Sequence, residues 1–153
     1  MPATKDVFLQ LATGLAHIHE KGLIHRDLKP ENVLISVDST GENVSMKWAD
    51  FGLSKQVNER GSHSISRIRG TENWYAPEIY RMQIEEENMT MATRRRGTVK
   101  SDVFTEGLVF GYHLLNGNHP YGSLYDVPIN IINDRPVNLN GIFHFLNQIY
   151  IAN

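Results

Sequence analysis

Two short segments of the sequence carry the side chains that phosphoryl transfer requires. The first is the octapeptide HRDLKPEN at residues 25–32, and the second is the tripeptide DFG at residues 50–52. Transfer of a phosphoryl group from a nucleotide needs a carboxylate to take the proton of the acceptor hydroxyl, a cation to hold the migrating phosphate, and oxygen ligands for Mg²⁺. These two segments contain all three kinds of group, and the pattern therefore predicts phosphoryl-transfer chemistry.

Together, the two segments resemble the catalytic loop and the metal-binding signature of the protein kinase superfamily. The resemblance implies that Asp27 is the catalytic base and that Lys29 stabilises charge on the transferred phosphoryl group. It also implies ATP and Mg²⁺ as cofactors, with Lys29, Asn32 and Asp50 binding the nucleotide complex. Asn32 and Asp50 would be the metal ligands, because amide and carboxylate oxygens suit a hard cation. A lysine at position 29 is typical of the serine/threonine branch.

Five further residues have counterparts in the same family. By this resemblance, His25 supports the catalytic loop and Arg26 anchors the activation segment. Thr71 corresponds to the supporting threonine of the family, and Glu78 belongs to the Ala-Pro-Glu sequence that closes the activation segment. Asp102 resembles the buried carboxylate that receives backbone N–H bonds from the catalytic loop, but a helix cap is an equal alternative for it.

Four stretches narrow the resemblance to the inositol-requiring stress sensors of the endoplasmic reticulum, namely residues 61–67, 70–74, 101–104 and 117–122. Members of that family join a cytosolic kinase domain to an endoribonuclease. The likeness implies a cytoplasmic location for this segment and an endoplasmic reticulum anchor in a longer parent protein. It also implies that the partners are a protein substrate or the kinase itself, and a second kinase copy in a homodimer.

Ser62, Ser64 and Ser66 are the candidate autophosphorylation sites under this resemblance. Arginines stand nearby at positions 60, 67 and 69. A doubly charged phosphate on one of the serines would form charge-assisted bonds with these arginines and would order the loop. The alternative is a flexible serine- and arginine-rich loop without a regulatory role.

The resemblance divides the chain into two parts. Residues 1–122 form a partial kinase domain with the catalytic loop, the activation segment and a central helix, and residues 123–153 are a weakly matching continuation. The implied fold is α+β and kinase-like, mainly the helical large lobe. The glycine-rich loop and strand lysine of a small lobe are not recognisable, so we expect that lobe to be missing and the isolated chain to show no measurable phosphotransfer. The alternative function is a catalytically inactive, truncated kinase fold that acts as an interaction module.

Apolar spacing predicts the elements that position the first motif. Residues 6–21 form a predicted helix that ends at Gly22, because apolar side chains recur there at spacings of three and four. The apolar stripe of this helix consists of Phe8, Leu11, Leu15 and Ile18. Short apolar runs predict strands at residues 23–24, 32–36 and 44–48, and the last two are joined by a polar turn.

Later segments are predicted from composition and charge. Residues 53–70 have loop composition, and opposed charge blocks at residues 83–97 predict a solvated insertion. Residues 101–115 predict a helix that begins with a cap formed by Ser101 and Asp102, and its apolar content on nearly all sides predicts a core position. Residues 129–132 predict a short helix.

Composition limits the remaining classes of function. The chain has 153 residues, with 15 Lys and Arg against 17 Asp and Glu and a net charge of −2, so one domain without bulk binding of nucleic acid is expected. The absence of cysteine excludes disulfides, thiolate zinc sites and a cysteine nucleophile. No apolar run is long enough to predict a membrane span.

Overall fold

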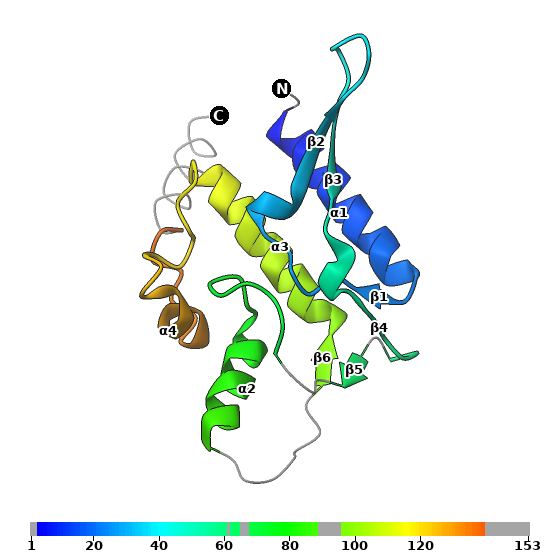
Figure 1. Cartoon of the computed structure of the whole chain (residues 1–153). Helices are drawn as coiled ribbons and strands as arrows, with labels where there is room; N and C mark the ends of the chain where they lie inside the picture. The colour runs from blue at the N-terminus through cyan, green and yellow to red at the C-terminus, as the bar shows by residue number, and fades with distance from the viewer. Residues whose placement is uncertain (1–2, 61, 65–67, 89–95, 140–153) are drawn as a thin grey trace, which may run out of the picture.

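The computed structural model describes residues 3–60, 62–64, 68–88 and 96–139 of the chain (Figure 1). Its elements follow in the order α1 (Thr4–Glu20), β1 (Leu23–Ile24), the 3₁₀ turn η1 (Pro30–Asn32), β2 (Val33–Val37), β3 (Val44–Trp48), the 3₁₀ turn η2 (Phe51–Leu53), β4 (Lys55–Gln56), β5 (Ser62–Ser64), α2 (Pro77–Asn88), β6 (Arg96–Thr98), α3 (Val99–Leu114) and α4 (Val127–Ile132). Within the described residues the strands pair as β1–β4, β2–β3 and β5–β6, all antiparallel. This mixed helix and strand content agrees with the predicted α+β class.

Helix α1 forms where the apolar spacing predicts a helix, with small shifts at both ends. Its buried residues are Val7, Leu11, Leu15 and Ile18. Phe8 of the predicted apolar stripe is only partly buried at the edge of this core, and its neighbour Val7 is buried instead. The chain leaves the helix through Gly22, whose φ of 71° lies in the left-handed region that glycine adopts without strain.

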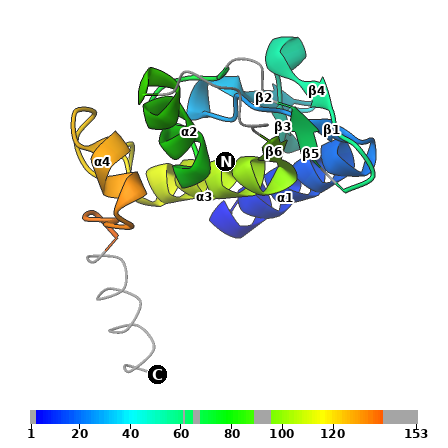
Figure 2. The same cartoon turned by 90° about the horizontal axis from the view of Figure 1, so that it is seen from below.

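Helices α1 and α3 lie side by side and run in opposite directions (Figures 1 and 2). Near the start of α1, the Phe8 ring stacks on Phe110 with 4.2 Å between the ring centroids. Near the end of α1, His19 Nε2 lies 2.9 Å from Asp102 Oδ2. Loop 25–32 bonds to α3, and the β2–β3 hairpin packs on α1.

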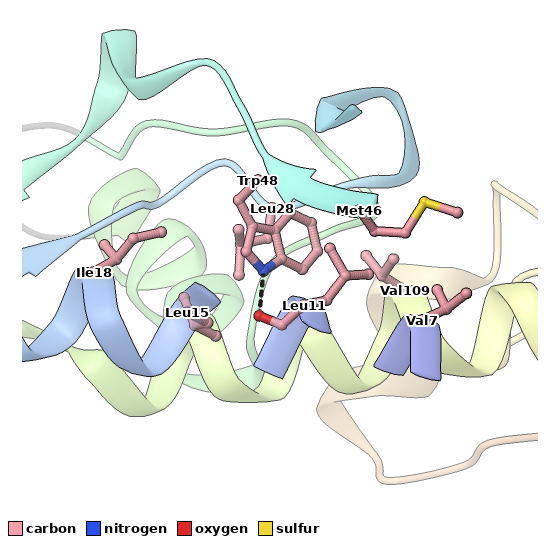
Figure 3. Close-up of a cluster of buried hydrophobic side chains, with 8 residues drawn as sticks. All are labelled: Val7, Leu11, Leu15, Ile18, Leu28, Met46, Trp48 and Val109. Atoms are coloured by element: carbon pink, nitrogen blue, oxygen red, sulfur yellow. Dashed lines mark hydrogen bonds between the residues drawn. The ribbon is translucent and has the colours of Figure 1, made fainter. Parts of the chain in front are cut away.

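The β2–β3 hairpin packs over α1 and closes the main core (Figure 3). The Trp48 indole N–H donates to the Leu11 carbonyl at 3.0 Å, and the Met46 N–H donates to Gln10 Oε1 at 2.7 Å. These bonds fix the strand on the helix. The buried members of this core are Val7, Leu11, Leu15, Ile18, Leu28, Met46, Trp48 and Val109.

The turn at residues 38–43 closes the far end of the hairpin, and all of its residues are exposed. Asp38 Oδ1 accepts hydrogen bonds from the Thr40 N–H at 3.1 Å and from the Thr40 hydroxyl at 2.7 Å, and Asn43 Nδ2 donates to Asp38 Oδ2. The bonds from Thr40 and Asn43 lower the pKa of Asp38 to about 2. The turn is therefore organised by its own side chains.

Helix α3 differs from its sequence prediction in two ways. It begins after Thr98, so Ser101 and Asp102 lie inside the helix and the predicted cap is wrong. The predicted core position is confirmed, because Leu108 and Val109 are buried in apolar clusters. Burial on nearly all sides is wrong, because Val103 and Leu114 are exposed and more than half of the buried residues are polar. The buried face packs on loop 25–32 and on the segment that precedes α2, where Asp102 and Thr105 find hydrogen-bond partners.

A second apolar cluster joins α2, α3 and α4. Its buried residues are Tyr80, Leu108, Tyr121, Val127 and Ile131. Helix α4 confirms the short helix predicted at residues 129–132. Helix α2 extends to Asn88, so the first part of the predicted insertion at residues 83–97 is helical, and residues 89–95 lie outside the described part of the chain. The predicted loop at 53–70 contains the short strands β4 and β5.

Candidate active site

The β2–β3 hairpin brings the two sequence motifs together at one end. Val33 pairs with Trp48 in its register, so Asn32 and Ala49 are the next residues across the ribbon. The Ala49 N–H continues the pairing by donating to the Asn32 carbonyl at 2.9 Å. Because Asp50 follows Ala49, the two predicted metal ligands, Asn32 and Asp50, lie at the same end of the hairpin.

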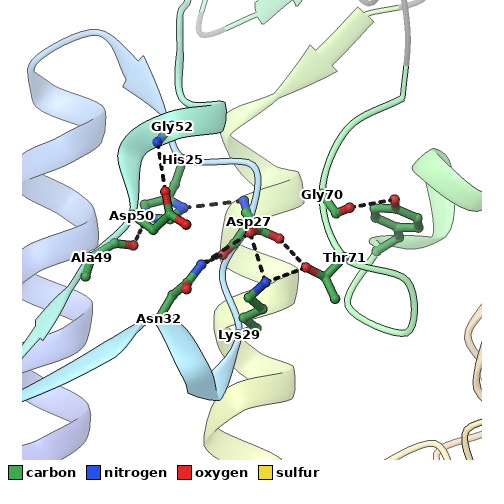
Figure 4. A network of polar contacts seen from close by, with 10 residues as sticks. His25, Asp27, Lys29, Asn32, Ala49, Asp50, Gly52, Gly70 and Thr71 are labelled. Carbon is green, nitrogen blue, oxygen red and sulfur yellow. Dashed lines mark hydrogen bonds and ion pairs between the residues drawn. The ribbon is translucent and has the colours of Figure 1, made fainter.

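Asp27 lies at the centre of a group of polar contacts (Figure 4). The residue is 7% exposed. Its Oδ1 accepts a hydrogen bond from the Thr71 hydroxyl at 2.6 Å, and its Oδ2 lies 3.2 Å from Lys29 Nζ. Asn32 Nδ2 donates to the Asp27 carbonyl at 2.7 Å and to Asp27 Oδ2 at 3.3 Å. Both carboxylate oxygens are thus held in place by neighbouring side chains.

Lys29 and Thr71 connect loop 25–32 to the segment before α2. Lys29 Nζ donates to Thr71 Oγ1 at 2.7 Å, and the same hydroxyl donates to Asp27. An ammonium group has three N–H donors, and its contacts with Thr71 and Asp27 use two of them. The third can bind an anionic group beside the Asp27 carboxylate, which is where phosphoryl transfer needs a cation.

Asp50 presents an exposed carboxylate close to this group. Its φ and ψ of 62° and 78° lie in the left-handed region, which a residue other than glycine adopts at a cost and which is common at functional positions. Its Oδ1 accepts a hydrogen bond from the Gly52 N–H at 3.1 Å. In Figure 4 the side chains of Asp27, Asn32 and Asp50 gather in one group.

Asp102 holds the main chain of loop 25–32. Its side chain is 3% exposed, and it accepts hydrogen bonds from the His25 N–H at 2.7 Å and the Arg26 N–H at 2.9 Å. Arg26 has a φ of 70°, so these bonds help to maintain a left-handed conformation. The His25 ring bonds to the Ala49 carbonyl through Nε2 at 3.0 Å. The loop is therefore attached to both α3 and the end of β3.

The Arg26 side chain extends toward the segment that follows the DFG tripeptide. Its Nε donates to the Leu53 carbonyl at 2.6 Å. Arg26, Arg69 and His63 line one small cavity. Burial and the charge of Arg69 lower the pKa of Arg26, whereas the charge of Asp102 opposes that shift. Burial and the positive charge of Arg26 lower the pKa of His63, which favours its neutral form.

The structure places the three candidate phosphorylation sites differently. Ser62 is buried, and its hydroxyl donates to Asn58 Oδ1 at 3.0 Å. Ser64 ends β5 opposite Arg96 of β6. Ser66 lies outside the described residues. Access to the Ser62 hydroxyl would therefore require this part of the segment to change its conformation.

Two structural contacts at the site were not predicted from the sequence. Ser101 donates a hydrogen bond from its hydroxyl to Glu78 Oε1 at 2.7 Å, which ties α2 to α3. His19 contacts Asp102 across the helix pair. Only their positions in the sequence could have indicated these contacts. Ser101 directly precedes Asp102, and His19 lies at the end of the helix that leads into loop 25–32.

The protein kinase domain family matches residues 1–141 of the chain. The chain belongs to the protein kinase family. The serine/threonine-protein kinase/endoribonuclease ire-1 of Caenorhabditis elegans is 36% identical over 136 residues, which cover 86% of this chain and 13% of that protein. Serine/threonine-protein kinase/endoribonuclease IRE2 of Homo sapiens is 38% identical over 132 residues, with coverage of 85% and 13%. The sensor for unfolded proteins in the ER ire1 of Schizosaccharomyces pombe is 33% identical over 140 residues, with coverage of 83% and 13%.

These comparisons confirm the predicted kinase family and the likeness to the inositol-requiring sensors. The kinase match continues past residue 122, into the segment for which the sequence predicted a weaker continuation. The chain spans 13% of the length of each of these relatives, so their full activities belong to much longer proteins. In the described part of this kinase chain, no helix is both long and apolar enough to cross a membrane.

Proposed function

We propose that this chain supplies the catalytic centre for ATP-dependent phosphoryl transfer to serine or threonine hydroxyls. The observation that carries the proposal is the set of contacts around Asp27, with the Thr71 hydroxyl on one oxygen and the Lys29 ammonium beside the other. The Asp27–Lys29 ion pair is partly buried, and such a pair contributes little net stability once desolvation is included. A functional role therefore accounts for this arrangement better than a purely structural one.

The residues at the end of the hairpin fit a magnesium–nucleotide complex. Asn32 uses its Nδ2 to donate to Asp27, so its Oδ1 is the atom available to a cation. Asp50 binds the Gly52 N–H through Oδ1, and its Oδ2 makes no hydrogen bond to the described residues. One amide oxygen and one carboxylate oxygen are ligands that Mg²⁺ accepts, with its other positions filled by water and phosphate oxygens.

The proposed mechanism depends on groups that are already oriented by one another. Mg²⁺-ATP supplies the phosphoryl group and neutralises part of its charge when bound. Asp27 accepts the proton of the acceptor hydroxyl at a carboxylate oxygen. Lys29 holds positive charge 3.2 Å from that carboxylate, and Thr71 keeps the ammonium and the carboxylate together. Little reorganisation is then needed as charge develops on the transferred group.

The names of the relatives extend the proposal to the parent protein. The Schizosaccharomyces pombe relative is a sensor for unfolded proteins in the endoplasmic reticulum, and the human relative is a kinase and endoribonuclease. We infer that this chain belongs to the cytoplasmic kinase of such a stress sensor and phosphorylates a protein substrate or a second copy of itself. Phosphorylation of Ser62 would require its hydroxyl to leave Asn58 first.

Paramagnetic NMR with Mn²⁺-ATP tests the metal and nucleotide site. Mn²⁺ accepts the same oxygen ligands as Mg²⁺, and it broadens the amide signals of residues close to it. In the full 153-residue chain, we expect the signals of Asn32 and Phe51 to broaden, and we expect Asp50→Ala to remove the effect. Asp38→Ala is the matched control, because Asp38 is also exposed but lies at the other end of the hairpin.

Two results would contradict the proposal. The first is that neither signal broadens, which would favour the interaction module. The second is that Asp50→Ala and the wild type broaden equally, which would remove Asp50 as a ligand. In the longer parent protein, Asp27→Asn should lower kcat by about 100-fold or more, the usual contribution of a general base. Its broadening by Mn²⁺-ATP should be retained, because Asp27 is not a proposed ligand.

A further inference from the structure

Glu106 is a buried acid that the proposed chemistry does not use. It lies on α3 one helical turn after Asp102 and is 8% exposed. Its Oε1 is buried and has no hydrogen-bond partner among the described residues. A carboxylate in such a place loses its hydration without full compensation, so its neutral form is favoured.

Three side chains from three elements interact with Glu106. They are the Trp48 indole of β3, the His19 imidazole of α1 and the Asp102 carboxylate of α3. His19 and Asp102 are themselves in contact at 2.9 Å. Asp102 also accepts the hydrogen bonds of the main-chain N–H groups at residues 25 and 26. Glu106 is therefore the direct neighbour of the acid that anchors the catalytic loop.

We propose that Glu106 is a positioning residue whose charge state sets how firmly Asp102 holds the catalytic loop. While Glu106 is protonated, it adds no charge beside Asp102, and the loop stays closed on α3. When Glu106 ionises, two carboxylates one turn apart repel each other in a region that water reaches poorly. Separation of the loop from α3 lets water reach Asp102 and screen this repulsion. Loop opening therefore becomes more frequent as Glu106 loses its proton.

The direction of the pH response follows from the burial of this acid. Burial raises the pKa of Glu106 to about 7, the charge of Asp102 acts in the same direction, and Trp48 and His19 oppose the shift. The closed loop binds this proton more tightly than the open loop, in which water around Asp102 screens the repulsion that disfavours the ionised form. By linkage, closure is strongest below neutral pH and weakens as pH rises through about 7.

The consequence for catalysis rests on the proposed function, because the loop carries Asp27 and Lys29. Loop closure itself can be measured without nucleotide and without metal. Loss of the pH response would leave the proposed phosphoryl transfer intact. Conversely, absence of Mn²⁺-ATP binding would leave the pH response of the loop intact, so the two failures are distinguishable.

Amide hydrogen exchange on the full chain tests the proposal. Protection of the His25 and Arg26 amides is measured at pH 6 and pH 8 and corrected for the intrinsic exchange rates. Between these values, a group with a closed-state pKa near 7 and an ordinary open-state pKa reduces protection by up to about tenfold. We expect that loss in the wild type and less than about twofold loss in Glu106→Gln. Glu85→Gln, an exposed acid on α2, should behave like the wild type.

A second variant separates Glu106 from the imidazole beside it. His19→Gln removes a titratable ring but keeps an N–H donor for Asp102, and we expect it to retain the pH response. The proposal is overturned if Glu106→Gln keeps the full response or if His19→Gln abolishes it. Should Glu106→Gln fail to fold, carbon-13 NMR of the wild-type Glu106 carboxyl decides the question. Titration near pH 7 supports the proposal, and titration near pH 4.5 overturns it.

Discussion

Replacing Asp102 by asparagine should release the main chain of the catalytic loop. The two oxygens of Asp102 accept the His25 N–H at 2.7 Å and the Arg26 N–H at 2.9 Å. Asparagine has nearly the same shape but only one oxygen. It can accept one of these bonds, and its NH₂ group would then face the other N–H donor.

The expected cost follows from these two bonds. A hydrogen bond to a charged acceptor is worth about 1.5–3 kcal/mol, and one to a neutral acceptor about 1 kcal/mol. Asp102→Asn loses one bond, weakens the second and leaves a buried N–H of the loop unpaired. Relaxation of Arg26 from its left-handed φ of 70° recovers part of the loss. The free energy of unfolding should therefore fall by about 3 kcal/mol.

Urea unfolding followed by far-ultraviolet circular dichroism measures this change. Asp6→Asn provides a control with the same charge change at an exposed position in the first turn of α1, and it should cost less than about 1 kcal/mol. The reasoning is refuted if Asp102→Asn destabilises the chain no more than this control and leaves the amide chemical shifts of His25 and Arg26 unchanged.

Two further predictions concern buried side chains away from the loop. Trp48→Phe removes the indole N–H that donates to the Leu11 carbonyl and leaves a gap in the main core, so the urea midpoint should fall by the equivalent of about 2 kcal/mol. Burial lowers the pKa of His119 to about 4, so acid should weaken the fold between about pH 6.5 and pH 4, by up to about 3 kcal/mol. His119→Asn should remove that loss while its side-chain oxygen accepts the Tyr121 N–H in place of Nδ1, and an equal acid loss in both proteins would contradict this. The loss of stability in acid is compared between His119→Asn and the wild type, because protonation of Glu106 changes the stability in the opposite direction over an overlapping pH range.

Local signals in the sequence were sufficient for α1 and for the hairpin. Apolar spacing and the glycine at position 22 act over a few residues, so α1 and its end are predicted within about two residues. The strand pair β2–β3 was predicted for the same reason, since its turn joins neighbouring segments. Its register could not be predicted, although that register brings Asn32 and Asp50 together.

The polar face of α3 shows where local reasoning fails. Pattern analysis treats apolar residues as buried, but α3 buries Asp102, Thr105 and Glu106. The reason is long-range: Asp102 bonds the catalytic loop, and the Thr105 hydroxyl donates to the Trp74 carbonyl at 3.0 Å. Asp102 was identified only through the family resemblance, and Glu106 carries no motif. Its role depends on neighbours from α1 and β3 that the chain order does not bring together.

The hairpin turn offers a practical site for labelling this kinase chain. Residues 38–43 extend beyond the body of the fold (Figure 1), and their bonds are made mostly among themselves. An epitope tag or fluorophore inserted there would be accessible and would leave the strand register beside the DFG tripeptide unchanged.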